Sequence, residues 1–274
     1  MRFSRNIRKV WWNSEGTSPN FWRKKLPIRE GLTKMSYRVL NNPLSSLMLD
    51  IVVPGSLILD AGCGPMIWAN AFSIKDAEYI GLDYSMSLLQ RGNKFNELGK
   101  KLKTTVGDVQ ALPFSDNSID MYISLGIMEH FEEGMEPSLN ECQRILKSCG
   151  VACISVPYLN WIRAILLPFD FFVLKLKEWN FLRTILGKKP IRPKNFYQFA
   201  YSVIELRNLI FKSGMCVEII QPHAWDFGLT RDYKWFRLLK RRKPELFNII
   251  MNVFRSISPF FCAHMVMIVA RKPQ

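Results

Sequence analysis

The 274-residue sequence predicts an α/β fold in which helices cover both faces of a mostly parallel sheet. Two observations predict it. Apolar stretches of strand length alternate with amphipathic stretches from residue 56 onward, and strands joined by helices form parallel crossover units. Acidic residues stand where three of the apolar stretches end, and α/β sheets bind ligands at the carboxyl ends of their strands.

Seven stretches have the apolar composition of strands. They span residues 56–62, 78–85, 102–108, 119–126, 151–158, 215–222 and 262–273. Helical spacing is seen at residues 65–74, 85–101, 137–150 and 202–214, and a further helical pattern covers residues 30–53. Glycine commonly follows the last turn of a helix, so we expect Gly150 and Gly214 to end the helices before them.

The expected organisation is an N-terminal cap segment over residues 1–49 and one α/β domain over residues 50–274. Two insertions interrupt this domain, at about 158–200 and at about 223–258. Both are aromatic and basic and lack a strand pattern, and the second is expected to be irregular. We expect the insertions to form a helical lid whose apolar side packs on the core and whose Lys and Arg side chains face water.

The net charge of +15 is unevenly distributed. Residues 1–49 carry ten Lys/Arg and two Asp/Glu, and residues 158–274 carry twenty and seven. Residues 50–157 carry eight and fourteen, so the middle of the chain is mildly acidic. This split indicates that the flanks meet an anionic partner, which could be a membrane surface, RNA or the substrate itself.

The cysteines and the apolar segments exclude several classes of protein. The six cysteines are scattered and there are three histidines, without metal-ligand spacing, so we expect reduced thiols, no metal site and a cytoplasmic location. The first residues have no apolar core of a signal peptide. The most apolar stretches, 164–174 and 246–254, are too short to span a bilayer.

The stretch LILDAGCGPM, residues 57–66, holds the clearest candidate site. Glycines at 62 and 64 let a ligand approach bare backbone, and the positive end of the following helix would face the same place. Ile67 stands where the dinucleotide fingerprint requires its third glycine, so that fingerprint fails. Asp60 would repel a pyrophosphate and favours a cationic or zwitterionic ligand.

Two more acids follow the next two expected strands. Asp83 comes about 20 residues after the glycines, where nucleotide sites place a carboxylate that accepts hydrogen bonds from ribose hydroxyls. Asp108 can accept from an exocyclic amine, and Val109 and Leu112 offer apolar faces to a flat ring. The alternative is a plain α/β domain whose acids cap helices.

This order of glycines and acids resembles the class I S-adenosylmethionine-dependent methyltransferases, in their small-molecule, methyltransferase type 11-like branch. The resemblance covers residues 50–157 and more faintly 197–273, including LPFSDNSIDMYISLGIMEHF, ECQRILKSCGVACISVP and HMVMIVARKP. It implies a Rossmann-like sheet of seven strands with the last one antiparallel, and S-adenosyl-L-methionine as the cofactor. Met66 stands where the family usually has glycine.

The resemblance also assigns roles to residues. The stretch from Asp60 to Gly64 would face the methionine part of the cofactor, Asp83 the ribose, and Asp108 with Val109 the adenine. The reactive methyl group would emerge beside the fourth strand. The cofactor-binding residues expected on this basis are Asp60, Ala61, Gly62, Gly64, Asp83, Tyr84, Asp108, Val109 and Leu125.

His130 is the candidate general base, because it follows the fourth strand where the family places its acceptor. The alternative is a histidine that holds the loop. Glu129 is expected to orient this loop or to contact the polar end of the cofactor. Tyr37 and Arg38 would either close over the methionine carboxylate or lie on a surface helix.

The acceptor is expected to be a small, apolar or lipid- or glycan-linked molecule, methylated at O, N or C. DNA base-amino methylation is not expected, because SLGIME stands where such enzymes carry an Asn/Asp-Pro-Pro-aromatic motif. The apolar and basic insertions suit an anionic membrane surface, which would place the chain at the inner face of a membrane. An RNA methyltransferase using the basic flanks and a non-catalytic binding subunit of the same fold remain alternatives.

Overall fold

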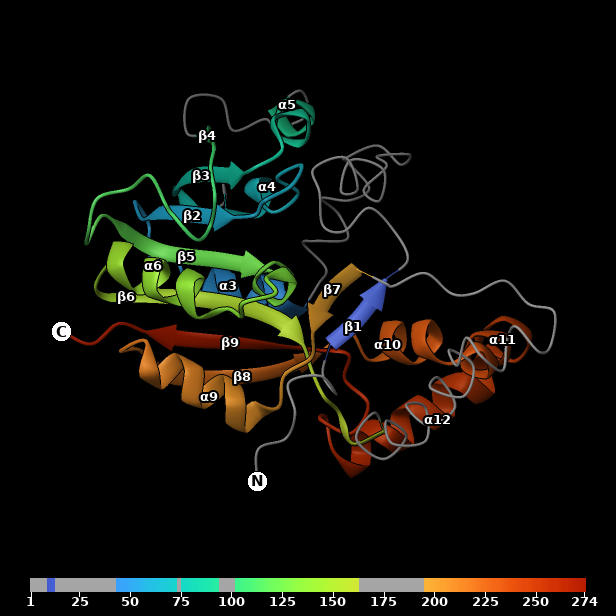
Figure 1. Cartoon of the computed structure of the whole chain (residues 1–274). Coiled ribbons are helices and arrows are strands. Elements are labelled where there is room, and N and C mark those ends of the chain that lie inside the picture. Colours follow the sequence, from blue (N-terminus) through green and yellow to red (C-terminus); the bar gives the residue numbers. More distant parts are fainter. Residues whose placement is uncertain (1–8, 13–42, 73–74, 94–101, 163–194) are drawn as a thin grey trace, which may run out of the picture. The chain divides into compact units, whose positions relative to one another are not determined.

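The computed structural model describes residues 9–12, 43–72, 75–93, 102–162 and 195–274 (Figure 1). The chain divides into two compact units. The sheet unit comprises Thr17–Ser155, Leu206–Ile220 and Ile268–Gln274, and the helical unit comprises Met1–Gly16, Val156–Glu205 and Gln221–Met267. Both expected insertions fall mainly in the helical unit, together with the start of the chain.

The central feature is a sheet of seven strands in the order β4-β3-β2-β5-β6-β9-β8. Strands β2 to β6 run parallel to one another, which confirms the predicted parallel sheet. Its strands are β2 (Leu57–Ala61), β3 (Glu78–Asp83), β4 (Leu102–Val106), β5 (Ile119–Leu125), β6 (Leu146–Pro157), β8 (Cys216–His223) and β9 (Met265–Arg271).

The last strand, β9, runs antiparallel to β6 (Figure 1). Cys149 and Gly150 of β6 exchange backbone hydrogen bonds with Lys272, whereas Tyr158, further along the chain, donates to the carbonyl of His264. The expected antiparallel last strand is therefore confirmed. Strand order reverses at β2, which has β3 on one side and β5 on the other, and such a switch point is where α/β sheets bind ligands.

Helices pack around this sheet and make up much of the helical unit (Figure 1). The strands β2 and β3 are almost wholly buried, which explains their continuous apolar sequence. The helices are α3 (Pro43–Ile51), α4 (Ala69–Phe72), α5 (Met86–Asn93), the 3₁₀ turn η4 (Met128–His130), α6 (Glu136–Ile145), α9 (Val203–Lys212), α10 (Trp225–Asp232), α11 (Lys234–Arg242) and α12 (Pro244–Ile257).

Two predicted helix boundaries are wrong. The helix expected from residue 65 begins only at Ala69, because Met66 adopts a left-handed φ of 54° and residues 64–68 form turns. The helix expected to continue to Gly150 ends at Ile145, and β6 starts at once. The helix expected over 85–101 is seen at Met86–Asn93, and residues 94–101 lie outside the described residues.

The early end of α6 has a long-range cause. The carbonyls of Arg144 and Ile145 accept the N–H groups of Asn117 and Ser118. The Lys272 ammonium donates to the carbonyls of Gln143 and Leu146, each within 2.8 Å. These partners satisfy the last carbonyls of the helix without a further helical turn.

The helical unit contains structure that the sequence did not predict. Strand β1 (Lys9–Trp12) pairs antiparallel with β7 (Asn195–Phe199) in a sheet of two strands, although neither segment was expected to be a strand. The stretch 223–258 forms α10, α11 and α12, so its helices agree with the expected helical insertion and the expected irregular backbone is wrong. These helices enclose an apolar core that includes Phe236, Phe247 and Met251.

No helix among the described residues has both the length and the apolar character that a membrane span requires.

Candidate functional site

The glycine loop after β2, residues 62–64, is fastened to the end of β3. The N–H groups of Gly62 and Cys63 both donate to the carbonyl of Leu82, at 2.7 and 3.0 Å. The N–H of Gly64 donates to Asp83 Oδ2 at 2.9 Å. We expected these N–H groups and a helix N-terminus to face a ligand, but the N–H groups are used within the protein and α4 begins five residues later.

Asp83, at the end of β3, is hydrogen-bonded to the segments that follow β2 and β4. Its Oδ1 accepts the N–H of Ser85 at 2.8 Å, and its backbone carbonyl accepts the N–H of Gly107, after β4, at 3.3 Å. The side chain is buried, which raises its pKa, and the N–H donors of Ser85 and Gly64 oppose this effect. A carboxylate has about four lone-pair positions, so two remain for the hydroxyls of a ligand.

Asp60 has a protein partner that sequence reasoning missed, the Tyr79 hydroxyl, which donates to Asp60 Oδ2. Asp60 lies opposite Gly81 in the β2–β3 pairing, which puts Asp60 and Tyr79 on one face of the sheet. The pKa of Asp60 is raised to about 7, because burial and the nearby charge of Asp83 raise it by more than the Tyr79 hydrogen bond lowers it. The pair follows from the register of β2 against β3, which the structure supplies.

Met66 turns its side chain into the core. It is buried, and a Cβ on Gly81 would lie 2.7 Å from its Sδ and a Cβ on Gly92 2.5 Å from its Cε. The two glycines of β3 and α5 therefore make room for this methionine. The side chain against the glycine loop is Ile127, whose Cγ1 would lie 2.5 Å from a Cβ on Gly62.

The loop after β4 carries the third acid. Asp108 is exposed and its Oδ1 accepts the N–H of Gln110 at 2.9 Å, while Val109 and Leu112 are buried. Asp83 pairs with Val106 across β3 and β4, and the Gly107 N–H donates to the Asp83 carbonyl, so the two acids follow neighbouring strand ends. Asp108 thus presents a carboxylate to solvent beside apolar side chains.

Two residues of α6 hold this loop in place, and sequence reasoning missed both. Glu141 Oε2 accepts the N–H of Leu112 at 2.7 Å. Arg144 donates to the carbonyls of Leu112 and Phe114, at 3.0 and 2.7 Å, and pairs with Glu141 and Asp116. The hydrogen bonds of Arg144 and Leu112 lower the pKa of Glu141. The sequence signal that could have identified them is the spacing of Glu141 and Arg144, three residues apart on an expected helix.

The end of β5 supplies the other side of the site. Leu125 is half-buried, and Gly126 follows with a φ of 79°. Glu129 is buried, and its Oε1 lies 3.7 Å from Nε2 of His130. The backbone N–H of His130 donates to the Ile127 carbonyl. Ile127 reaches the glycine loop, so the segment that carries His130 adjoins Gly62.

The remaining predicted residues are placed as follows. Ala61 is fully buried at the end of β2. Tyr84 is 42% exposed beside Asp83, and burial together with the charge of Asp83 raises its pKa. Tyr37 and Arg38 lie outside the described residues. Among the residues that the structure describes, no group of three His, Cys, Asp or Glu side chains could hold a metal ion.

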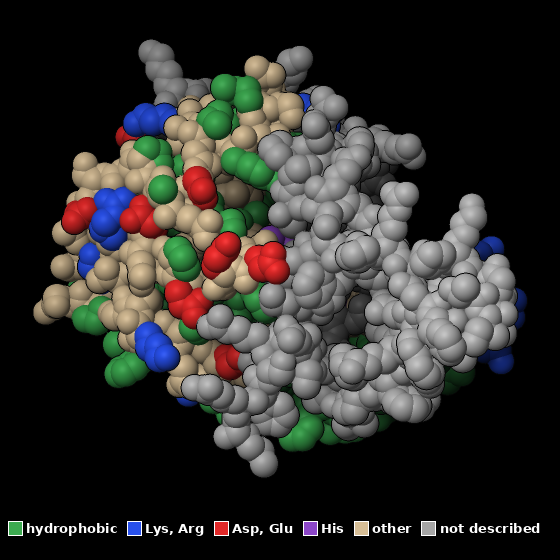
Figure 2. Space-filling view, viewed as in Figure 1, with side chains coloured by type: hydrophobic (Ala, Val, Ile, Leu, Met, Phe, Trp, Pro, Cys, Tyr) green, Lys and Arg blue, Asp and Glu red, His purple; other side chains and the backbone are tan. Residues whose placement is uncertain are grey.

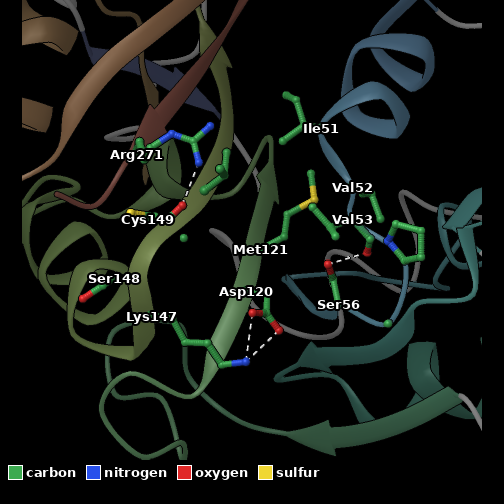
Figure 3. Close-up of a pocket in the computed structure, with 14 residues that line it drawn as sticks. Ile51, Val52, Val53, Ser56, Asp120, Met121, Lys147, Ser148, Cys149 and Arg271 are labelled. Atoms are coloured by element: carbon green, nitrogen blue, oxygen red, sulfur yellow. Dashed lines mark hydrogen bonds and ion pairs between the residues drawn. The ribbon is translucent and has the colours of Figure 1, made fainter. Parts of the chain in front are cut away.

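A separate cavity of about 350 Å³ lies at the other end of the strands (Figure 3). Val53 and Ser56, before β2, line one side of it. Lys147 pairs with Asp120 at 2.8 Å, and Arg271 donates to the carbonyl of Cys149 at 2.7 Å. Because this cavity is at the amino ends of β2 and β5, it is not part of the site at the glycine loop.

A comparison with families of known proteins matches residues 59–154 to a methyltransferase domain. A demethylmenaquinone methyltransferase from Staphylococcus carnosus is 34% identical over 104 residues, which are 37% of this chain and 43% of the relative. One of the same name from Staphylococcus epidermidis is 29% identical over 176 residues, 60% of this chain and 69% of the relative. The match to the first relative thus spans less than half of its length.

Solved structures share the fold. One chain of a complex between a methyltransferase activator and a methyltransferase from Haloferax volcanii is 18% identical, with a TM-score of 0.60, over 96% of this chain and all of that one. An S-adenosylmethionine-dependent methyltransferase from Mesorhizobium loti is 15% identical, with a TM-score of 0.54, over 85% of this chain and all of that one. The glycine loop and the three strand-end acids fall within or directly beside residues 59–154, and these residues match a methyltransferase domain.

Proposed function

We propose that this chain transfers the methyl group of S-adenosyl-L-methionine to a small apolar acceptor. The observation that carries the proposal is the position of Asp83. Its carboxylate accepts the N–H of Gly64 and the N–H of Ser85, and it can still accept further hydrogen bonds. It does so beside the point where strand order reverses.

The residues present fit the chemical parts of this cofactor. Asp83 would accept hydrogen bonds from the ribose hydroxyls, with Tyr84 beside it. Asp108 has a solvent-exposed carboxylate for the adenine amine, and Val109, which is buried next to it, would lie beneath the ring. The stretch from Asp60 to Gly64, with Ala61 and Gly62, and Leu125 across from it would border the methionine part.

The cofactor supplies a methyl group already activated by a positively charged sulfur. The task of the protein is then to align the acceptor with that group and to exclude water, and alignment can supply about 7–11 kcal/mol. His130 takes the proton of the acceptor O–H or N–H when the nucleophile must lose one. Glu129, whose Oε1 lies 3.7 Å from His130 Nε2, stabilises the protonated imidazole.

The relatives named demethylmenaquinone methyltransferase favour an apolar, ring-bearing acceptor. A lipid- or glycan-linked acceptor fits the apolar and aromatic composition of the insertions. The second candidate is RNA, favoured by the basic flanks. In each case the chain would act in the cytoplasm.

Calorimetry with S-adenosylhomocysteine tests the cofactor assignment. Asp83→Ala should weaken binding about 10- to 100-fold, because it removes acceptors for the ribose and the anchor of Gly64. Asp50→Ala, at an exposed acid on α3, is the matched control and should bind normally. If the unaltered protein does not bind S-adenosylhomocysteine, the proposal is overturned. If Asp83→Ala binds it as tightly as the unaltered protein, the ribose assignment is removed.

The acceptor is tested by the transfer of labelled methyl groups from S-adenosyl-L-methionine. A demethylated quinone and total RNA are offered in parallel. Incorporation into the quinone supports the apolar acceptor. Incorporation into RNA, with a steep loss of binding as salt rises, replaces it with the second candidate.

A further inference from the structure

Helices α11 and α12 of the helical unit combine a strong positive charge with apolar side chains in water. Residues 234–257 contain seven Lys or Arg and a single acid, Glu245. Figure 2 shows Lys and Arg side chains at the edge of the molecule where Figure 1 places α11. Neither helix is long and apolar enough to cross a membrane.

One face of each helix is already covered. Phe236 of α11 lies edge-on against Phe247 and Phe254 of α12, and these rings pack with Met251 in the core of the unit. The apolar residues that this core uses account for the folding of the two helices against each other. They do not account for the apolar residues elsewhere on the same helices.

A second apolar stripe on α12 faces solvent. Leu246, Ile249, Val253 and Ile257 are each more than 40% exposed. They follow one another at intervals of three, four and four residues, which places them along a single face of the helix. The side chains of Asn248 and Asn252 are also exposed and lie beside the stripe, on its polar flank.

On α11, exposed apolar and basic residues occur on the same face. Trp235 and Leu238 are exposed, and Arg241 and Arg242 follow Leu238 by three and four residues. Within the described residues, no acid forms an ion pair with Lys234, Arg241, Arg242 or Lys243. In contrast, Lys240 and Arg255 are both paired with Asp226.

We propose that the α11–α12 surface binds peripherally to an anionic lipid bilayer. The apolar stripe of α12 with Trp235 and Leu238 enters the boundary between headgroups and acyl chains, and the unpaired basic side chains contact the anionic headgroups. A surface that is both apolar and basic matches this partner, whereas a nucleic acid would use the charge and leave the stripe in water.

Vesicle flotation with the full chain tests this surface. The protein should float with vesicles that contain phosphatidylglycerol and should stay in solution with pure phosphatidylcholine vesicles. Binding should weaken as salt rises, because exposed charges are screened. Failure to float with anionic vesicles at low salt overturns the proposal.

Paired variants separate the stripe from general charge. Ile249→Asp/Val253→Asp should lower vesicle binding roughly tenfold or more, because it removes apolar area that the bilayer would bury. Asn248→Asp/Asn252→Asp makes the same change of charge on the polar side of α12 and should bind far better than the first variant. Equal losses in the two variants overturn the proposal, because charge alone would then explain binding.

Charge reversal and competition complete the test. Arg241→Glu/Arg242→Glu should also lower binding roughly tenfold or more. Ribosomal RNA at equal charge should compete weakly. If RNA binds more tightly than vesicles and Ile249→Asp/Val253→Asp leaves that binding intact, the surface is a nucleic-acid site instead. Circular dichroism checks that each variant is folded, and Ile257→Asp replaces either stripe substitution that unfolds the chain. These measurements need no methyl transfer, so their outcome is independent of the proposed reaction.

Discussion

The Tyr79 hydroxyl donates a hydrogen bond to the Asp60 carboxylate in a part of the sheet unit where both side chains are buried. Asp60 lies near the end of β2, directly before the glycine loop, and Tyr79 lies near the start of the neighbouring strand β3. The protonation of Asp60 therefore affects the stability of the sheet unit beside the glycine loop.

Asp60 should make stability depend on pH. Its pKa is about 7 in the folded chain and 3.8 as a free side chain, so between these values the folded state holds a proton that the unfolded state has released. Stability from this group is then complete below about pH 4 and is lost as pH rises through about 7, by up to about 4 kcal/mol. Urea unfolding of the chain and of Asp60→Asn at pH 4.5 and 8 isolates the effect. Parallel pH profiles for the two would contradict it.

Gly62 should not tolerate a side chain. A Cβ there would lie 2.5 Å from Ile127, at a φ of 81°. Gly55, with a φ of 80° and open space around it, is the matched control. Gly55→Ala should cost roughly 1 kcal/mol and Gly62→Ala at least about 1 kcal/mol more. Thermal unfolding measures both. Combining Ile127→Ala with Gly62→Ala should remove the extra destabilisation of Gly62→Ala over Gly55→Ala. Equal losses would show that backbone strain alone matters.

Met66 should resist replacement by glycine, which is usual at this position in the methyltransferases that the chain resembles. Met66→Gly relieves the left-handed φ but empties the space between Gly81 and Gly92, so it should destabilise the chain by about 2–4 kcal/mol. Asp76→Gly, at an exposed residue with a φ of 56°, should change stability by less than about 1 kcal/mol. Chemical unfolding compares the two. A stabilised Met66→Gly would show that strain outweighs packing.

Arg144 should act as a positioning residue for the loop that carries Asp108. Arg144→Lys loses the paired hydrogen bonds to Leu112 and Phe114, and S-adenosylhomocysteine binding should fall about 3- to 30-fold while the fold is retained. Lys103→Ala removes an exposed ion pair of β4 and should leave binding unchanged. Calorimetry measures both. A loss of folding without a loss of affinity per folded molecule would assign Arg144 a purely structural role.

His130 should affect turnover more than cofactor binding. As a general base it would contribute roughly 10²–10⁴-fold, so His130→Ala should lower kcat by that factor and remove the rise of kcat with pH, with the Kd for S-adenosylhomocysteine unchanged. Initial rates across pH, combined with calorimetry, provide the measurement. Near-normal turnover with normal cofactor binding would retire the base and leave a histidine that holds the loop.

The strands could be predicted because burial on both faces gives them continuous apolar sequences, as in β2 and β3. The end of α6 could not, because Lys272, Asn117 and Ser118 satisfy its carbonyls from distant parts of the chain. The pairing of β1 with β7 also joins segments far apart in sequence. The pattern of residues within one segment does not indicate hydrogen-bond partners that are distant in sequence.

The same limit applies to the site. The acids and glycines stand out in the sequence, because carboxylates and glycines that directly follow buried strands are typical of ligand sites in α/β sheets. The contact between Asp60 and Tyr79 and the place of Met66 depend on the register of β2 against β3. The insertions were expected to lie beside the acceptor, and residues 163–194 of the first one lie outside the described part of the chain.

Strand β9 follows every other strand in sequence yet lies between β6 and β8. While the chain is being synthesised, β6 and β8 therefore each keep an open hydrogen-bonding edge until residues 265–271 emerge from the ribosome. Open edges invite pairing with other chains. Messages truncated before this strand should therefore yield protein that aggregates unless chaperones bind it, in place of a shortened folded protein.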